Sequence, residues 1–205
     1  QKDRMEAIAH KVTFLSPELL RISHIDVLED VAPISLLHEV LSPKGFNASQ
    51  IRDIYRSLSS SQSGKRFFST EWEVLRDREY LWIQKKDSSP LIPELIIEEI
   101  ERTPSFVIPR DKHIACLDAD KLNHPLTIRK WERGDKFIPL GMNGKKKVSD
   151  YLTDKKYSLF QKENQYVVCS GEDIVWLVNE RTDHRYRITD STQRILLIKI
   201  KKDGQ

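Results

Sequence analysis

The residues with the clearest chemical potential in this 205-residue chain are lysines and arginines within residues 126–162. That segment holds ten Lys or Arg and four Asp or Glu, an excess of six positive charges, whereas the whole chain has a net charge of +3. The basic character is therefore a patch, and a patch indicates a polyanionic partner more strongly than a uniformly basic surface does. The predicted phosphate contacts in this segment are Arg129, Lys130, Arg133, Lys136, Lys145, Lys146, Lys147, Lys155 and Lys156.

A loop with two glycines, residues 141–144, lies immediately before three of these lysines. Glycines permit backbone conformations that other residues avoid, so successive N–H groups could converge on an anion. We therefore predict backbone phosphate contacts at Gly141, Asn143 and Gly144. Residues 145–147 are expected just before or within the first turn of a helix, the end that favours negative charge. The alternative is a solvated hairpin tip with surface lysines.

The other residue types form no recognisable motif for a catalytic or metal site in the sequence. Residues 63–65 (SGK) lack the earlier glycine of a nucleotide-binding loop, and an arginine follows where Ser or Thr would bind magnesium. The six histidines show no metal-binding spacing, and neither cysteine lies in a nucleophile motif. We expect Cys116 and Cys169 to be reduced packing residues, and Trp131 to pack in a core rather than stack on a base.

The elements that must position the patch fall into two units. Residues 1–86 are predicted to form a small helical unit that ends in an antiparallel hairpin sheet. An amphipathic helix is expected over residues 2–12, a helix begins at Pro33, and Asn47 is the predicted N-cap of a third helix. Strands are then predicted at residues 66–69, 72–75 and 80–84.

Residues 85–90 are polar, end in proline and are the predicted linker. The second unit, residues 87–205, is expected to be mostly antiparallel β with one or two short helices, which makes the fold class α+β. Its central strand is expected to carry Arg129 and Lys130 and to end in a turn at Gly134. Further strands are predicted at residues 95–100, 105–108, 113–117, 166–170, 174–177, 185–189 and 195–200.

Composition sets the broad class of the protein. With 39% apolar and 32% charged residues, the chain is typical of a charge-rich globular protein. No stretch approaches the roughly 18 apolar residues of a membrane span, and no signal peptide precedes Gln1, so we expect a cytoplasmic protein without a membrane partner. Because the chain opens without methionine and inside an amphipathic pattern, we expect it to be a piece of something longer.

Five runs of the second unit form a specific series when they are taken in order: residues 117–121 (LDADK), 129–141 (RKWERGDKFIPLG), 145–152 (KKKVSDYL), 174–177 (IVWL) and 181–185 (RTDHR). Together they resemble the C-terminal domain of the bacterial tRNA(Ile)-lysidine synthetase family. The first unit is similar, more loosely, to that family's central substrate-binding domain, around residues 44–46 and 63–65. The two similarities together account for nearly all of the chain.

The resemblance implies a function for the second unit, with its motif core at residues 126–203. The family joins lysine to the wobble cytidine of tRNA(Ile), using ATP to adenylate the base. That chemistry, with its ATP and Mg, belongs to an N-terminal PP-loop domain whose phosphate loop this sequence does not contain. The resemblance therefore implies a C-terminal portion that grips the tRNA body and acceptor stem, holds no cofactor and has no catalytic centre.

The family's basic motif falls here on Arg129, Arg133, Lys146 and Lys147. The run at residues 181–185 adds Arg181 and Arg185 to the predicted nucleic-acid contacts. Many family members have a proline-containing, arginine-rich segment where this chain has residues 155–161 (KKYSLFQ), so this segment departs from the family pattern.

The expected partners are tRNA(Ile) and the chain's own N-terminal PP-loop domain, with a homodimer left open. An alternative function is an interdomain or oligomer-contact module whose basic patch pairs with acidic protein surface. A self-contained enzyme is a third alternative, and it would require a site that the sequence does not show.

Overall fold

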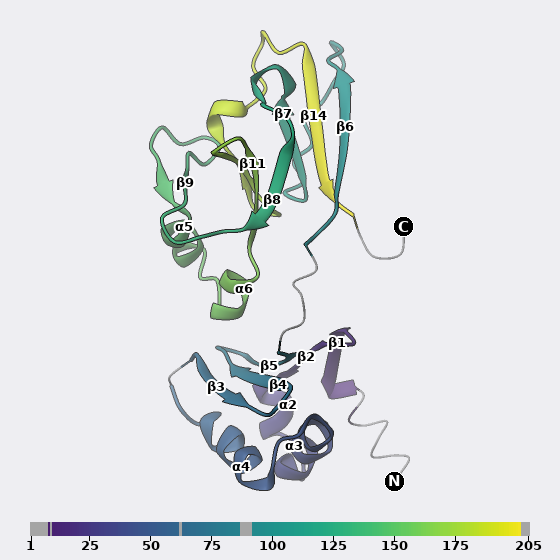
Figure 1. Ribbon diagram of the computed structural model, residues 1–205, viewed down its shortest axis with the longest axis vertical. Helices are drawn as coiled ribbons and strands as arrows, with labels where there is room; N and C mark the ends of the chain where they lie inside the picture. Colours follow the sequence, from purple (N-terminus) through teal and green to yellow (C-terminus); the bar gives the residue numbers. More distant parts are fainter. Residues whose placement is uncertain (1–7, 9, 62, 87–91, 202–205) are drawn as a thin grey trace. The chain divides into compact units, whose positions relative to one another are not determined.

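The computed structural model describes residues 8, 10–61, 63–86 and 92–201. The chain divides into two compact units, the first comprising residues 1–90 with 158–160, and the second residues 91–157 with 161–205 (Figure 1). Most of the helix predicted over residues 2–12 and most of the linker predicted at residues 85–90 lie outside the described residues. Within the described residues, no helix is long and apolar enough to cross a bilayer.

The first unit is built on a five-stranded antiparallel sheet in the order β1-β2-β5-β4-β3. The predicted hairpin strands are present, but the sheet is larger than predicted. Val12, which the sequence pattern assigned to the end of a helix, instead begins β1. The strands are β1 Val12–Ser16, β2 Leu19–Ser23, β3 Lys65–Phe68, β4 Trp72–Arg76 and β5 Tyr80–Lys85, and the helices are α2 His24–Leu28, α3 Pro33–Leu41, the 3-10 turn η1 Ser42–Lys44 and α4 Ala48–Ser57.

The helices of this unit cover one face of the sheet (Figure 1). Asn47 caps α4 as predicted, because its side chain accepts the N–H groups of Ser49 and Gln50 at 3.0 Å, while the Gln50 side chain accepts the Asn47 N–H. This capping box fixes the start of α4, so that Ile51 and Ile54 point into the core and are fully buried.

The second unit contains three antiparallel sheets. One has the order β6-β14-β7, the second β13-β12-β11-β8, and the third is the two-stranded ribbon β10-β9. The strands are β6 Leu95–Glu101, β7 Ile114–Asp118, β8 Leu126–Lys130, β9 Lys136–Phe137, β10 Lys146–Lys147, β11 Tyr166–Ser170, β12 Asp173–Leu177, β13 Arg181–Thr182 and β14 Arg194–Ile200, and the helical elements are η2 Ala119–Lys121, α5 Val148–Asp154, α6 Leu159–Glu163 and η3 His184–Tyr186.

These elements stack in three layers around the four-stranded sheet. On one face, Val168 and Trp176 pack with Leu117 and Leu196 of the three-stranded sheet. On the other face, residues of β11 and β12 pack against Phe137 of the ribbon and against Tyr151 and Leu152 of α5. The β-rich α+β fold with two short helices is as predicted.

Two predicted strands are absent from the described structure. Residues 105–108 belong to an irregular loop between β6 and β7, flanked by Pro104 and Pro109, which cannot donate to a strand ladder. Residues 185–189 do not pair either, because the Asp183 side chain accepts the Arg185 N–H at 2.9 Å and turns the chain into η3.

Candidate nucleic-acid interface

The β9-β10 ribbon places two lysines directly opposite each other. Lys136 pairs with Lys147 across the antiparallel strands, and Phe137 pairs with Lys146. Opposite residues share a face, so the full burial of Phe137 leaves Lys136 and Lys147 together on the outer face, where both are exposed. Neither lysine forms an ion pair with a carboxylate in the described parts of the chain. Like charges held in this position repel, which an anion between them would relieve.

Tyr151 of α5 lies near two further cations, Lys146 of the ribbon and Lys155 at the end of the helix. The Lys146 ammonium lies 5.9 Å and the Lys155 ammonium 5.8 Å from the centroid of the Tyr151 ring. Lys146 also pairs with Asp154, so its charge is partly compensated, whereas Lys155 has no carboxylate partner among the described residues. Burial raises the pKa of Tyr151, and the nearby Arg181 partly offsets this effect. The structure thus gathers these three predicted cations around a single aromatic ring.

Arg129 was predicted to bind phosphate, but its guanidinium is already engaged. Its two terminal nitrogens contact the Asp135 carboxylate at 2.8 and 3.0 Å, and Asp135 also accepts the Glu132 N–H. The hydrogen bond with Asp135 raises the pKa of Arg129. Burial would raise the pKa of Asp135, but the bonds from Arg129 and Glu132 outweigh it and lower that pKa. Arg129 therefore holds the turn at Gly134, where φ is +103°.

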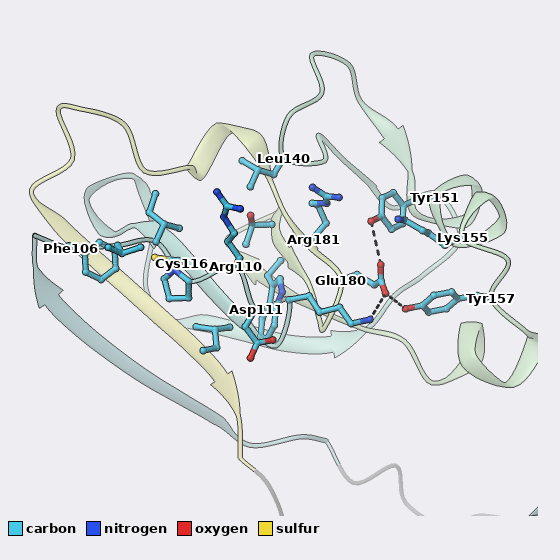
Figure 2. Close-up of a pocket in the computed structure, with 17 residues that line it drawn as sticks. Phe106, Arg110, Asp111, Cys116, Leu140, Tyr151, Lys155, Tyr157, Glu180 and Arg181 are labelled. Atoms are coloured by element: carbon cyan, nitrogen blue, oxygen red, sulfur yellow. Dashed lines mark hydrogen bonds and ion pairs between the residues drawn. The ribbon is translucent and has the colours of Figure 1, made fainter.

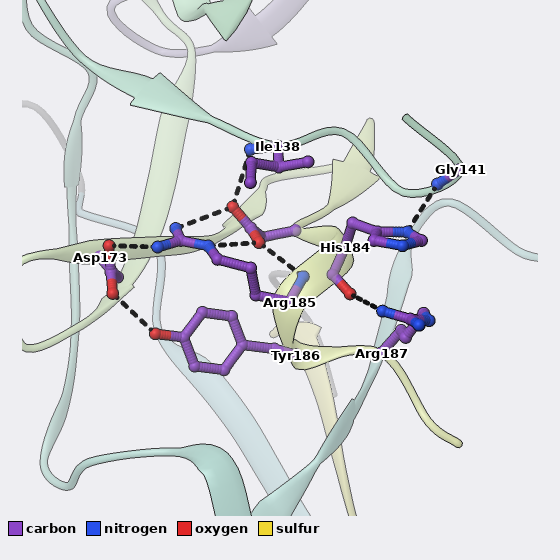
Figure 3. Close-up of polar contacts among 8 residues, drawn as sticks. Ile138, Gly141, Asp173, His184, Arg185, Tyr186 and Arg187 are labelled. Atoms are coloured by element: carbon purple, nitrogen blue, oxygen red, sulfur yellow. Dashed lines mark hydrogen bonds and ion pairs between the residues drawn. The ribbon is translucent and has the colours of Figure 1, made fainter. Parts of the chain in front are cut away.

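Arg185 is likewise engaged by carboxylates (Figure 3). It contacts the fully buried Asp183 through two nitrogens at 3.0 Å and Asp173 through a third at 2.8 Å. Hydrogen bonding to Asp183 and Asp173 raises the pKa of Arg185. Tyr186 donates to Asp173, and burial together with this bond raises the pKa of Tyr186 to about 12. The network fixes the backbone of η3 and pairs the charge of Arg185 with two carboxylates.

One backbone amide of the glycine loop, that of Gly141, is engaged within the protein. The Gly141 N–H donates to Nδ1 of His184 at 3.1 Å (Figure 3), so this amide is occupied within the protein. Gly141 has a φ of +89°, as its turn requires, whereas Gly144 is not in the left-handed region. Asn143 and Gly144 are exposed, and their role as phosphate contacts stays a prediction.

The helix after the three lysines begins at Val148, so the lysines lie just before its first turn and not within it. Lys146 and Lys147 form β10, Lys147 is the N-cap residue, and α5 has seven residues. The first helical N–H, that of Val148, donates to the Asp135 carbonyl at 2.9 Å. Lys146 and Lys147 therefore lie in the ribbon, ahead of the first turn of the helix.

The remaining predicted cations differ in their exposure. Arg133, Lys136, Lys145, Lys147, Lys155, Lys156 and Arg181 are exposed and Lys130 is half-buried. Lys145 lies close enough to Asp173 to help lower the pKa of that carboxyl, which burial alone would raise. The nucleic-acid role of these residues stays a prediction.

Predictions about packing residues were confirmed. Trp131 packs against the cluster of Phe137 and Tyr151 and donates its indole N–H to the Lys162 carbonyl. Both cysteines are free thiols, and burial raises the pKa of Cys116 to about 11 and also raises that of Cys169.

Among the described residues, no three His, Cys, Asp or Glu side chains are grouped to hold a metal ion.

The sequence predictions missed a pocket next to Tyr151 (Figure 2). It is lined by Lys155 and Arg181 of the predicted set, and also by Arg110 and Glu180, which were not predicted. Arg110 was overlooked because the loop that carries it follows a run predicted as a strand. The available signal was the pair of prolines, Pro104 and Pro109, that rules out a regular strand there.

Comparisons with known proteins point to one protein family. Residues 18–86 match the family described as TilS substrate binding domain. The chain is 52% identical over 193 residues to a tRNA(Ile)-lysidine synthase of Bacteroides thetaiotaomicron, covering 93% of this chain and 45% of the relative. It is 40% identical over 204 residues to the synthase of Parabacteroides distasonis, covering 93% and 46%. The chain thus spans less than half the length of these curated relatives.

A solved structure described as a TILS C-terminal domain is similar over 54% of this chain and 85% of that chain, with a TM-score of 0.47 and 19% identity.

Proposed function

This chain belongs to the tRNA(Ile)-lysidine synthase family, and on that premise we propose that it binds and positions tRNA(Ile). The proposed whole enzyme ligates lysine to the wobble cytidine with ATP, and an N-terminal PP-loop domain performs that chemistry. In this proposal the second unit grips the body and acceptor stem, and the 205 residues alone are inactive.

The observation that carries the proposal is the pair of opposed lysines, Lys136 and Lys147, on the outer face of the ribbon. A protein gains nothing in stability from two unpaired ammonium groups held across a two-residue ladder, so a bound anion is the simplest reason for them. Lys146 and Lys155 extend the positive surface around Tyr151. Paired RNA presents mainly phosphates and 2′-hydroxyls, which cations of this kind contact without reading a sequence.

The test uses the 205-residue chain and labelled tRNA(Ile) transcript, with fluorescence anisotropy over a series of salt concentrations. Reversing both ribbon lysines, Lys136→Glu with Lys147→Glu, is expected to weaken binding about ten-fold or more and to lower the salt slope by about two. Like charges still face each other in this variant, so its stability should stay near that of the wild type.

Lys199→Glu is the matched control, because Lys199 is exposed on β14, in the layer on the opposite side of the four-stranded sheet. It should change affinity less than about two-fold. Equal tRNA binding by wild type and the double variant would rule out the ribbon as the binding surface. Binding of an acidic protein surface in place of tRNA would instead support a protein-contact module.

A further inference from the structure

The second unit contains a pocket with a volume of about 1030 Å³ (Figure 2). One wall is the loop that carries residues 106–112, and the opposite wall is formed by Leu140 and residues 180–182. Tyr151, Lys155 and Tyr157 line the end formed by α5 and the segment that follows it. This volume is at the upper end of the range for ligand-binding pockets, so it can accept a nucleotide-sized group.

Apolar side chains form part of the lining of the pocket. Among them, Trp176 is buried, and the half-buried thiol of Cys116 also lines the pocket. At the rim, Val107, Ile108 and Leu140 are 82%, 48% and 39% exposed, which leaves three apolar side chains in water around one opening. A planar ligand that covers them would remove this surface from water.

Three cations surround the same opening. Arg110, Lys155 and Arg181 line the pocket and are exposed, and none of them pairs with a carboxylate in the parts of the chain that the structure describes. In Figure 2 the guanidinium groups of Arg110 and Arg181 extend to the same side, toward Leu140. Arginines placed in this way can each hold a phosphate through two parallel hydrogen bonds.

Two carboxylates line the pocket, Asp111 and Glu180. Asp111 is exposed and accepts the His113 N–H at 2.9 Å, whereas Glu180 is engaged by neighbouring side chains of the pocket. Glu180, whose side chain is 9% exposed, accepts from the hydroxyls of Tyr157 and Tyr151, the latter at 3.4 Å, and pairs with Lys112 at 3.4 Å. Burial, followed by the contact with Glu180, raises the pKa of Tyr157, which keeps that phenol protonated as a donor. Glu180 therefore fixes the two tyrosine rings while Arg110, Lys155 and Arg181 stay available.

We propose that this pocket binds unpaired nucleotides of an RNA, with a base against Val107, Ile108 and Leu140 and its phosphates on Arg110 and Arg181. The inference rests on the proposed function and deepens it. A base inside a helix is stacked and cannot enter a concave site, whereas an unpaired base can be splayed into one. An acidic peptide with apolar side chains is the competing occupant, but RNA is favoured because Tyr151 and Lys155 belong both to the pocket and to the surface around Lys146.

The experiment compares two labelled probes on the 205-residue chain, a six-nucleotide single-stranded RNA and a blunt RNA hairpin. Arg110→Glu and Ile108→Ser change exposed loop residues and should fold normally, which thermal melting can check. Each is expected to weaken the single strand about ten-fold and the hairpin less than two-fold. Ile108→Ser, which removes no charge, should leave the salt slope unchanged. Lys136→Glu with Lys147→Glu should show the reverse preference, and Lys199→Glu should affect neither probe.

The outcomes separate the two proposals. Suppose that the wild type binds the hairpin, and that both pocket variants bind the single strand as tightly as the wild type does. The pocket inference is then wrong and the proposed function stands. If the wild type binds neither probe nor tRNA, the proposed function fails and takes the inference with it. If a peptide of alternating Glu and Leu binds in a manner that Arg110→Glu abolishes, while single-stranded RNA does not bind, the pocket is a protein-contact site and the RNA assignment is overturned.

Discussion

At the scale of single residues, the cations predicted to bind nucleic acid fall into two groups. Arg129 and Arg185 hold turns through carboxylates, whereas Lys136 and Lys147 have no such partner in the described structure. An arginine with a buried carboxylate partner stabilises the fold and offers little to a phosphate. The charge count of the sequence cannot separate these roles, because the pairing partners of Arg185 lie on β12 and at the start of η3.

The structural role of the Arg185 network predicts a specific loss of stability. Asp183 is fully buried and accepts the N–H groups of Ile138 and Arg185 as well as the Arg185 side chain. Asp183→Ala should therefore lower the free energy of unfolding by about 3 kcal/mol, measured by urea denaturation. Glu172→Ala, at an exposed turn, is the control and should stay within about 0.5 kcal/mol. A loss below about 1 kcal/mol for Asp183→Ala would mean that the network contributes little.

Cys116 gives a prediction about pH. Burial raises its pKa from 9.0 to about 11, so the reactive thiolate is depleted about a hundred-fold at pH 8 relative to a thiol at the ordinary value. Alkylation by iodoacetamide, followed by mass spectrometry of the Cys116 peptide, should be slow at pH 8 and should still accelerate between pH 9 and pH 11. Unfolding in urea should restore the ordinary rate. A rate that levels off below pH 9 in the folded chain would contradict the raised pKa.

At the scale of elements, the β9-β10 ribbon predicts that stability and affinity change in opposite directions. Lys136→Glu replaces a repulsive pair with an attractive one across from Lys147, so the free energy of unfolding should rise by roughly 0.2–1 kcal/mol. The same change should weaken tRNA binding, because it removes one phosphate contact. Urea denaturation and anisotropy on one preparation measure both quantities. A variant that loses stability together with affinity would show that Lys136 has a structural role instead.

The elements that could be predicted from the sequence were those with local signals. Asn47 is followed three residues later by Gln50, and that spacing is sufficient to place the start of α4. Gly171 with its neighbours similarly marked the turn between β11 and β12. The missed features depend on distant partners: Val12 fits a helical pattern until its pairing with Ile22 of β2 is known. The pocket could not be predicted because its walls come from segments some 70 residues apart along the chain.

The candidate site shows the same division. The strand that carries Arg129 and the turn at Gly134 were predicted from the sequence, whereas Lys146 and Lys147, expected near the start of a helix, form a strand of the ribbon. The occupation of the Gly141 amide by His184 was not visible, because these residues are brought together only by the folded β13 and η3 region. Sequence spacing therefore identified the segment, and the structure separates the available groups within it from the engaged ones.

At the scale of the whole molecule, charge is distributed unevenly. The chain has a net charge of +3, although residues 126–162 alone carry an excess of six, so the remaining residues are net negative. A polyanion is attracted to one region and repelled by the others, which favours one orientation on approach. This pattern supports the proposal that residues 126–162 contact the tRNA.

The outer strand of the three-stranded sheet has a consequence for solubility. β6 is an edge strand, and it exposes Ile96 and Ile97 by 45% and 44%. Edges of this kind invite another strand to add, which leads to self-association. The same strand carries Glu98, Glu99 and Glu101 in exposed positions. A second copy that docked edge to edge would bring its own glutamates alongside these, and the repulsion between the carboxylates disfavours this association at neutral pH.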